Sequence, residues 1–220
     1  MTPIALRMMR GLSGLLVAAL LLGVGEVRAH PHVWITATSE VLYAPDGSVT
    51  GVRHAWTFDD TFSAQAVQGL EAKTKGTYSR EELAPLARTN LESMKAHAYY
   101  TFLKVNGKLA FEYPVDYFFD YKGEHLTLHF TLPLKAPVKS KSLSLEIVDR
   151  SFFVDFRMPE KDPVKLVDAP AGCRAFVRPP MGNVGDRKMV QAASEDSFKE
   201  GGANVTVGLL FDNKISVECP

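Results

Sequence analysis

The sequence predicts a mainly β protein, an antiparallel β-sandwich into which an EF-hand-like helix-loop-helix is inserted. Three observations lead to this fold class. Residues 32–43 and 49–58 alternate apolar and polar side chains, as half-buried strands do. Residues 61–97 are instead rich in helix formers. From residue 99 onward, short strand-like segments separated by Pro- and Gly-containing turns follow one another, which is typical of a sandwich.

The first 29 residues have the layout of a secretory signal peptide. Arg7 and Arg10 precede an apolar stretch at 12–24, and Val-Arg-Ala at 27–29 offers a cleavage site. The alternative is a membrane anchor, but the apolar stretch is shorter than the roughly 20 residues that span a bilayer. We therefore expect cleavage after Ala29, a mature chain that begins at His30 and does not span the membrane, and a periplasmic location.

The composition narrows the possible partners. The 220 residues include 25 basic and 25 acidic side chains. This balance argues against a nucleic-acid partner, which would require a basic face. Residues 30–220 are enough for one domain with an ordinary core, and we expect a single β-rich domain carrying the helical insertion at 61–97.

The first two strands are predicted to form a hairpin. Val33 and Ile35 share one face of the first strand, and Pro-Asp-Gly at 45–47 is a turn signal. In the insertion, Asp60 or Thr61 can cap the first helix. Ser79 and Glu82 form the capping box of the second.

The later strands follow the same logic. Asn-Gly at 106–107 is a strong signal for a tight hairpin turn. The polar, Gly-rich segment 181–203 shows little periodicity and is predicted to be a mobile loop. The remaining strands are expected at 99–105, 109–121, 124–132, 143–148, 152–156, 164–167, 175–177, 205–211 and 215–217.

The helix-loop-helix contains the spacing of a calcium-binding EF-hand loop. Glu71 would occupy its first position, Gly76 the sharp turn and Glu82 the last position. Lys73 and Lys75, however, stand where oxygen ligands are required, and ammonium groups cannot coordinate a cation. We expect a degenerate loop that binds no calcium and is held by charge pairs between these lysines and glutamates. A capped helical hairpin with chance spacing is the alternative.

The expected mature start, His30-Pro31-His32, offers a candidate metal site. Cleavage after Ala29 would release an α-amine beside two imidazoles, and imidazole binds zinc, nickel, cobalt and copper. Two residues apart on a strand, the side chains of His30 and His32 point the same way, about 6.6 Å apart. Pro31 has no amide proton, so the square-planar amino-terminal copper/nickel mode is blocked. The alternative is that the two histidines are solvent-exposed polar residues of a frayed terminus and bind no metal.

The other four histidines of the chain are further candidate ligands. His54 shares a strand face with apolar residues, so it is either a hydrogen-bonded core histidine or a third ligand that the hairpin brings to His30 and His32. His125 and His129 lie on one strand face but about 13 Å apart, too far to share an ion. His97 ends a helix, where an imidazolium interacts favourably with the helix dipole.

The chain has two cysteines, Cys173 and Cys219. In an oxidising compartment an isolated pair indicates a disulfide. A thiolate metal site is the alternative, and the large sequence separation makes it the weaker one.

Several segments resemble an uncharacterised family of periplasmic proteins that are described as components of an ABC-type transport system. The resemblance rests on residues 29–35 (Ala-His-Pro-His-Val-Trp-Ile), 56–64 (Trp-Thr-Phe-Asp-Asp-Thr-Phe-Ser-Ala), 78–83, 149–156 and 172–173. Members occur beside permeases of the nickel/cobalt type, and some are linked to zinc acquisition. The resemblance implies a metal-handling accessory protein. Calcium binding is not implied here, because Lys73 and Lys75 replace the Asp/Asn ligands of other members.

The leading hypothesis is a non-enzymatic periplasmic protein that passes Ni²⁺, Co²⁺ or Zn²⁺, with Cu²⁺ less favoured, to or from a membrane permease. His30, His32 and His54 are its candidate ligands. No serine-nucleophile motif, phosphate-binding glycine loop or HExxH motif occurs. Two alternatives stay open: an oxidative enzyme with a copper brace at the amino terminus, and a metal-free module that docks on a membrane partner.

Overall fold

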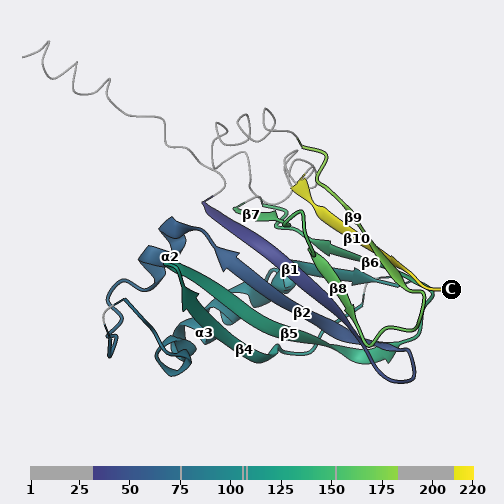
Figure 1. Cartoon of the computed structure of the whole chain (residues 1–220), viewed down its shortest axis with the longest axis horizontal. Helices are drawn as coiled ribbons and strands as arrows, with labels where there is room; N and C mark the ends of the chain where they lie inside the picture. Colours follow the sequence, from purple (N-terminus) through teal and green to yellow (C-terminus); the bar gives the residue numbers. More distant parts are fainter. Residues whose placement is uncertain (1–31, 75, 106, 108, 152, 183–210) are drawn as a thin grey trace, which may run out of the picture.

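The computed structural model describes residues 32–182 and 211–220, except 75, 106, 108 and 152. The predicted signal peptide, His30, Lys75 and nearly all of the predicted loop 181–203 therefore lie outside the described residues. The described chain is mainly β, as predicted, and its strands form two sheets (Figure 1).

The larger sheet has the order β4-β5-β2-β1-β7, with β8 also paired to β1. The predicted first hairpin is confirmed: β1 pairs antiparallel with β2, with Ile35 opposite Phe58 and Ser39 opposite His54. The strands of this sheet are β1 (Val33–Tyr43), β2 (Val49–Phe58), β4 (Val115–Lys122), β5 (His125–Val138), β7 (Val154–Arg157) and β8 (Val164–Val167).

The smaller sheet has the order β3-β6-β10-β9, and all its pairs are antiparallel. It consists of β3 (Thr101–Lys104), β6 (Ser142–Ile147), β9 (Arg174–Arg178) and β10 (Asn213–Glu218). Side chains from both sheets and from α3 belong to one buried cluster, in which Trp56, Phe130 and Phe156 are among the largest fully buried side chains. The two sheets thus share a core, as in a sandwich.

Two strands depart from the predicted antiparallel pattern. β7 pairs parallel with the start of β1, and β8 pairs parallel with its second half. β7 follows β6, so the chain reaches β1 after leaving the smaller sheet; β8 then follows β7 and continues along β1 in the same direction. The predicted strand 109–121 begins only at Val115, and Pro114, which has no backbone N–H to donate to a ladder, precedes it.

The helical insertion consists of α2 (Asp60–Ala66) and α3 (Arg80–Lys95), which lie at the β4–β5 side of the larger sheet (Figure 1). Asp59, one residue earlier than predicted, caps α2 by accepting from the Phe62 N–H. The predicted capping box of Ser79 and Glu82 is present. α3 buries Leu83, Ala87, Leu91 and Met94 at helical spacing, so its apolar stripe packs on the core.

Candidate functional site

His32 lies at the start of β1. Its backbone N–H donates to the Phe153 carbonyl at 2.9 Å, and its ring stacks on that of Phe153 with 4.8 Å between centroids. The side chain is exposed. The backbone of His32 is therefore held against the loop before β7, while its imidazole faces solvent at one end of the larger sheet.

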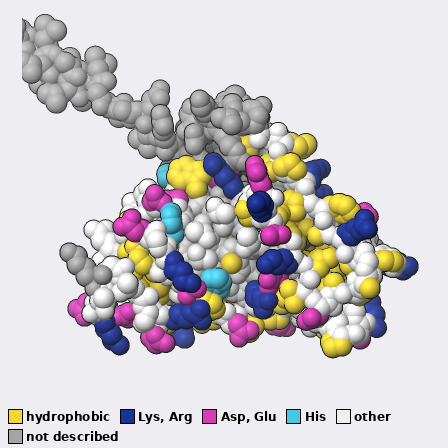
Figure 2. Space-filling view, viewed as in Figure 1, with side chains coloured by type: hydrophobic (Ala, Val, Ile, Leu, Met, Phe, Trp, Pro, Cys, Tyr) yellow, Lys and Arg dark blue, Asp and Glu magenta, His cyan; other side chains and the backbone are white. Residues whose placement is uncertain are grey.

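A cavity of about 610 Å³ adjoins this end of the larger sheet. Asp59 orders its wall, because one carboxylate oxygen accepts from the Trp34 N–H at 2.9 Å and the other from the Phe62 N–H at 3.0 Å. Histidine side chains are visible on this face of the molecule (Figure 2). The polar side chains around the cavity are Thr36, Thr57, Asp59, His125 and Arg157, and Trp34 adds an aromatic ring.

His125 is oriented by two oxygens at the mouth of this cavity. Its Nδ1 lies 3.2 Å from the Phe58 carbonyl oxygen and 3.2 Å from Oδ1 of Asp60. When neutral, Nδ1–H donates to these oxygens and Nε2 is left as the electron-pair donor. Metal-binding histidines are commonly oriented in this way. Among residues 32–182 and 211–220, however, no three His, Cys, Asp or Glu side chains are grouped closely enough to hold a metal ion.

His54 does not lie with His32, and its assignment as a third ligand is corrected. It stands opposite Ser39 in the hairpin, seven residues along β1 from His32, which is about 23 Å. Its side chain is 1% exposed. Nδ1 lies 2.9 Å from the Ser39 hydroxyl and Nε2 lies 3.2 Å from the Thr101 hydroxyl, so both ring nitrogens already have partners.

The hydrogen bonds around His54 fix its tautomer. The Thr101 hydroxyl donates its proton to the Tyr99 carbonyl at 2.8 Å, so its oxygen accepts from Nε2–H of His54. Nδ1 is then the acceptor for the Ser39 hydroxyl. Burial lowers the pKa of His54 to about 3. His54 is therefore a hydrogen-bonded core histidine, which was the alternative to a ligand in the sequence analysis.

His129 and His97 have partners of their own. His129 stacks on Phe118 at 4.6 Å and places Nε2 3.4 Å from Oδ2 of Asp120, and its pKa is lowered chiefly by burial. The guanidinium of Arg80 also contacts Phe118, with its central carbon 3.6 Å from the ring centroid. Because His125 and His129 contact different carboxylates, the structure does not bring them to one ion. His97, just after α3, stacks on Tyr100.

The loop with EF-hand spacing is closed by backbone amides. The Glu82 carboxylate accepts from the N–H groups of Lys73 and Ser79, at 2.9 and 2.7 Å. These bonds lower its pKa. In the described part of the chain no ion pair within 4 Å joins Lys73 to Glu71 or Glu82, but the charge of Lys73 makes a smaller contribution to the lowered pKa of Glu82. Lys75 lies outside the described residues.

The geometry around this loop also differs from an EF-hand. α2 ends at Ala66, whereas Glu71, the first position of the would-be loop, is exposed and outside any helix. Gly76 has φ +78°, the left-handed conformation that the sharp turn requires. The Glu82 carboxylate, which stands at the position of the bidentate calcium ligand of an EF-hand, is bonded to backbone amides in this structure.

The predicted disulfide between Cys173 and Cys219 is formed, which fits an exported protein. It ties the loop before β9 to the residues after β10. In the described residues, no helix combines the length and the apolar character needed to cross a bilayer.

A family model described as "Protein of unknown function (DUF1007)" matches residues 15–219. The chain belongs to this family. No curated protein matches the chain. The DUF1007 match extends from the apolar stretch near the amino terminus through the disulfide, so His32, the adjacent cavity and the helical insertion all lie inside the family region.

Sequence reasoning did not find two features of this DUF1007 protein. Asp60 and His125 meet because α2 starts beside β5, a tertiary arrangement that no local pattern signals. The residues around Tyr99 and Tyr113 line a second cavity, described below. The sequence signal that could have indicated this cavity is the proline at position 114, which interrupts the strand-like alternation that begins at residue 109.

Proposed function

We propose that this protein is an exported, non-enzymatic metal-binding accessory that passes Ni²⁺, Co²⁺ or Zn²⁺ to or from a membrane permease in the periplasm. His30, His32 and the α-amine released by cleavage of the signal peptide supply the ligands. The observation that carries the proposal is the His-Pro-His sequence together with the exposure of His32 immediately before β1.

The surroundings of His32 suit an ion that must be released again. Its backbone is fixed by the Phe153 carbonyl and its ring is supported by the Phe153 ring, so one ligand is held in place by the fold. Its exposed position at the end of a sheet leaves the ion accessible to a partner protein. Borderline nitrogen ligands favour nickel, cobalt and zinc over calcium.

The donor set contains neither His54 nor the loop of Glu71 to Glu82. His54 is enclosed in the core with both nitrogens bonded. Glu82 is bonded to backbone amides. The proposed site therefore has three nitrogen donors at the amino terminus, and the open positions on the ion are free for a permease ligand.

Isothermal titration with Ni²⁺, Co²⁺, Zn²⁺ and Cu²⁺ tests this assignment on the processed protein, after mass spectrometry has confirmed that it begins at His30. We expect micromolar or tighter binding of one of the first three ions, lost in the His30→Ala/His32→Ala variant. His97→Ala is the matched control, because it removes another exposed imidazole elsewhere. Equal binding by the double variant and the control would reject the terminal site.

A further inference from the structure

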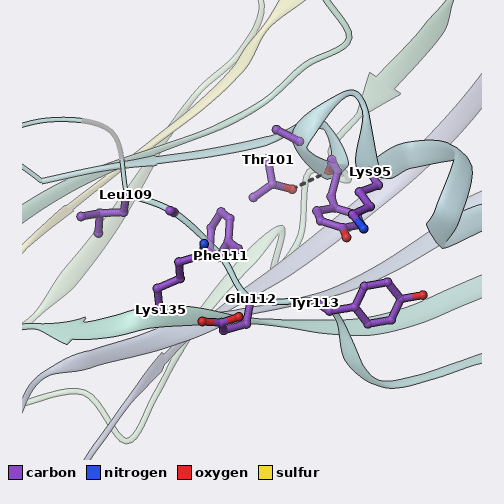
Figure 3. Close-up of a pocket in the computed structure, with 10 residues that line it drawn as sticks. Lys95, Thr101, Leu109, Phe111, Glu112, Tyr113 and Lys135 are labelled. Atoms are coloured by element: carbon purple, nitrogen blue, oxygen red, sulfur yellow. Dashed lines mark hydrogen bonds between the residues drawn. The ribbon is translucent and has the colours of Figure 1, made fainter.

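A second cavity lies far from the His32 end of the sheet and is independent of the proposed metal function. Its volume is about 520 Å³, within the range of small-molecule sites. It opens between the end of α3, the short turn η1 (Ala98–Tyr100) and residues 109–113, which run beside β5 (Figure 3). Leu109, Ala110, Phe111 and the rings of Tyr99 and Tyr113 make its wall mostly apolar.

Two lysines from different elements border this cavity. Lys95 comes from the last turn of α3, and Lys135 comes from β5; Figure 3 shows Lys95 at the helix end and Lys135 near Phe111, on different elements that border the cavity. Within the described residues neither ammonium group has an ion pair or a hydrogen-bonded partner. Glu112 is the one carboxylate among the residues that line the cavity, so the lining itself carries two ammonium groups and one carboxylate. A second carboxylate, Glu92, lies next to the lining and accepts from the Tyr113 hydroxyl.

The turn that borders the cavity has a strained backbone. Ala98, Tyr99 and Tyr100 have φ values of 52°, 53° and 51°. These three consecutive residues are in the left-handed backbone conformation, which residues other than glycine rarely adopt. The Tyr99 carbonyl accepts from Thr101, and Thr101 in turn accepts from the buried His54. This chain of hydrogen bonds connects the turn to the core. Strained backbone persists where the surroundings enforce it, and such positions cluster at ligand sites.

The opposite wall is also held in place. Residues 110–112 pair with β5, since the Lys135 N–H donates to the Ala110 carbonyl at 3.1 Å and the Glu112 N–H donates to the Pro133 carbonyl at 2.8 Å. The Tyr113 hydroxyl donates to the Glu92 carboxylate on α3 at 2.7 Å, which fixes the distance between this wall and the helix. The cavity is thus formed by ordered elements on both sides.

From the apolar walls and the two lysines without carboxylate partners, we propose that this cavity binds a small organic monoanion with a flat apolar body, such as an aromatic carboxylate. The rings of Phe111 and Tyr99 would contact the apolar body. The ammonium groups of Lys95 and Lys135 would attract the carboxylate, against the repulsion of Glu112.

The test uses 2-naphthoate as the probe and 2-naphthamide as its neutral isostere, titrated into the full processed protein by isothermal calorimetry. We expect naphthoate to bind and naphthamide to bind at least about tenfold more weakly, because the amide loses the charge-assisted contact. Lys95→Gln and Lys135→Gln should each weaken naphthoate binding several-fold. Lys165→Gln, an exposed lysine on β8, is the matched control and should leave it unchanged.

Two further variants separate this cavity from binding elsewhere. Glu112→Gln removes the repelling carboxylate and should tighten naphthoate binding, the opposite sign to the lysine variants. Ala110 is an exposed residue that lines the cavity, so the larger side chain of Ala110→Trp should fill the cavity and abolish binding of both probes. Equal affinity for the two probes, lysine variants that match Lys165→Gln, undiminished binding by Ala110→Trp, or no binding at millimolar naphthoate would each overturn the proposal.

Discussion

Acidification should destabilise this protein through His54. The ring is enclosed between the two sheets, with centroids 5.1 Å from Trp56 and 5.0 Å from Phe130, and both of its nitrogens are bonded to hydroxyls. Burial lowers the pKa to about 3 in the folded protein, whereas an unfolded histidine titrates near 6.5.

The sign and size of the effect follow from this difference. Between about pH 6.5 and pH 3 the unfolded chain binds a proton that the folded protein does not, so the free energy of unfolding falls as the pH falls. The contribution of His54 is complete above about pH 6.5 and decreases by about 1.4 kcal/mol for each pH unit below it. At pH 4.5 the loss is about 3 kcal/mol, a large part of a typical domain's stability.

Urea unfolding at pH 7 and pH 4.5 measures the effect in the wild type and in His54→Gln. The variant is less stable at pH 7, because the amide fits the site less well. The fall in its stability between pH 7 and pH 4.5 should, however, be smaller than that of the wild type by about 3 kcal/mol. His97→Gln, which replaces an exposed histidine, should retain the wild-type dependence. If His54→Gln loses as much stability on acidification as the wild type, the reasoning is refuted.

Three other predictions concern the stability of the fold. The Cys173→Ser/Cys219→Ser variant should lose up to about 4 kcal/mol in urea unfolding, because the bridge closes a separation of 46 residues; an unchanged midpoint would contradict this. Ser79→Ala should lower the free energy of unfolding by about 1 kcal/mol through loss of the α3 cap, and Ser79→Asp, which can still cap, should restore most of it. Millimolar calcium should leave the thermal midpoint unchanged, since Glu82 is bonded to amides; a clear rise would show that the loop binds the ion.

The parts of the fold that local patterns determine were predictable. Alternation along residues 32–43 and 49–58 was enough for the first hairpin, since a strand buried on one face must repeat every second residue. The capping box at Ser79 and Glu82 marked the start of α3. The two cysteines predicted the bridge because no other pairing was possible.

The remaining features depend on tertiary neighbours. The parallel pairing of β7 and β8 with β1 follows from where the chain returns to the sheet. The role of His54 was undecided in the sequence, because the two hydroxyls that satisfy its ring come from Ser39, opposite it in the hairpin, and from Thr101, 47 residues away. Glu82 likewise has an EF-hand position in the sequence, but its carboxylate bonds to amides of the same loop.

The most direct test of the central claim compares two chains, one beginning at His30 and one beginning at Val33, in a zinc and nickel titration. The shorter chain keeps all of β1 but lacks the amine, His30 and His32. We predict that the longer chain binds one of these ions with micromolar or tighter affinity and that the shorter chain does not. Equal affinities would contradict a metal site at the amino terminus and with it the proposed function.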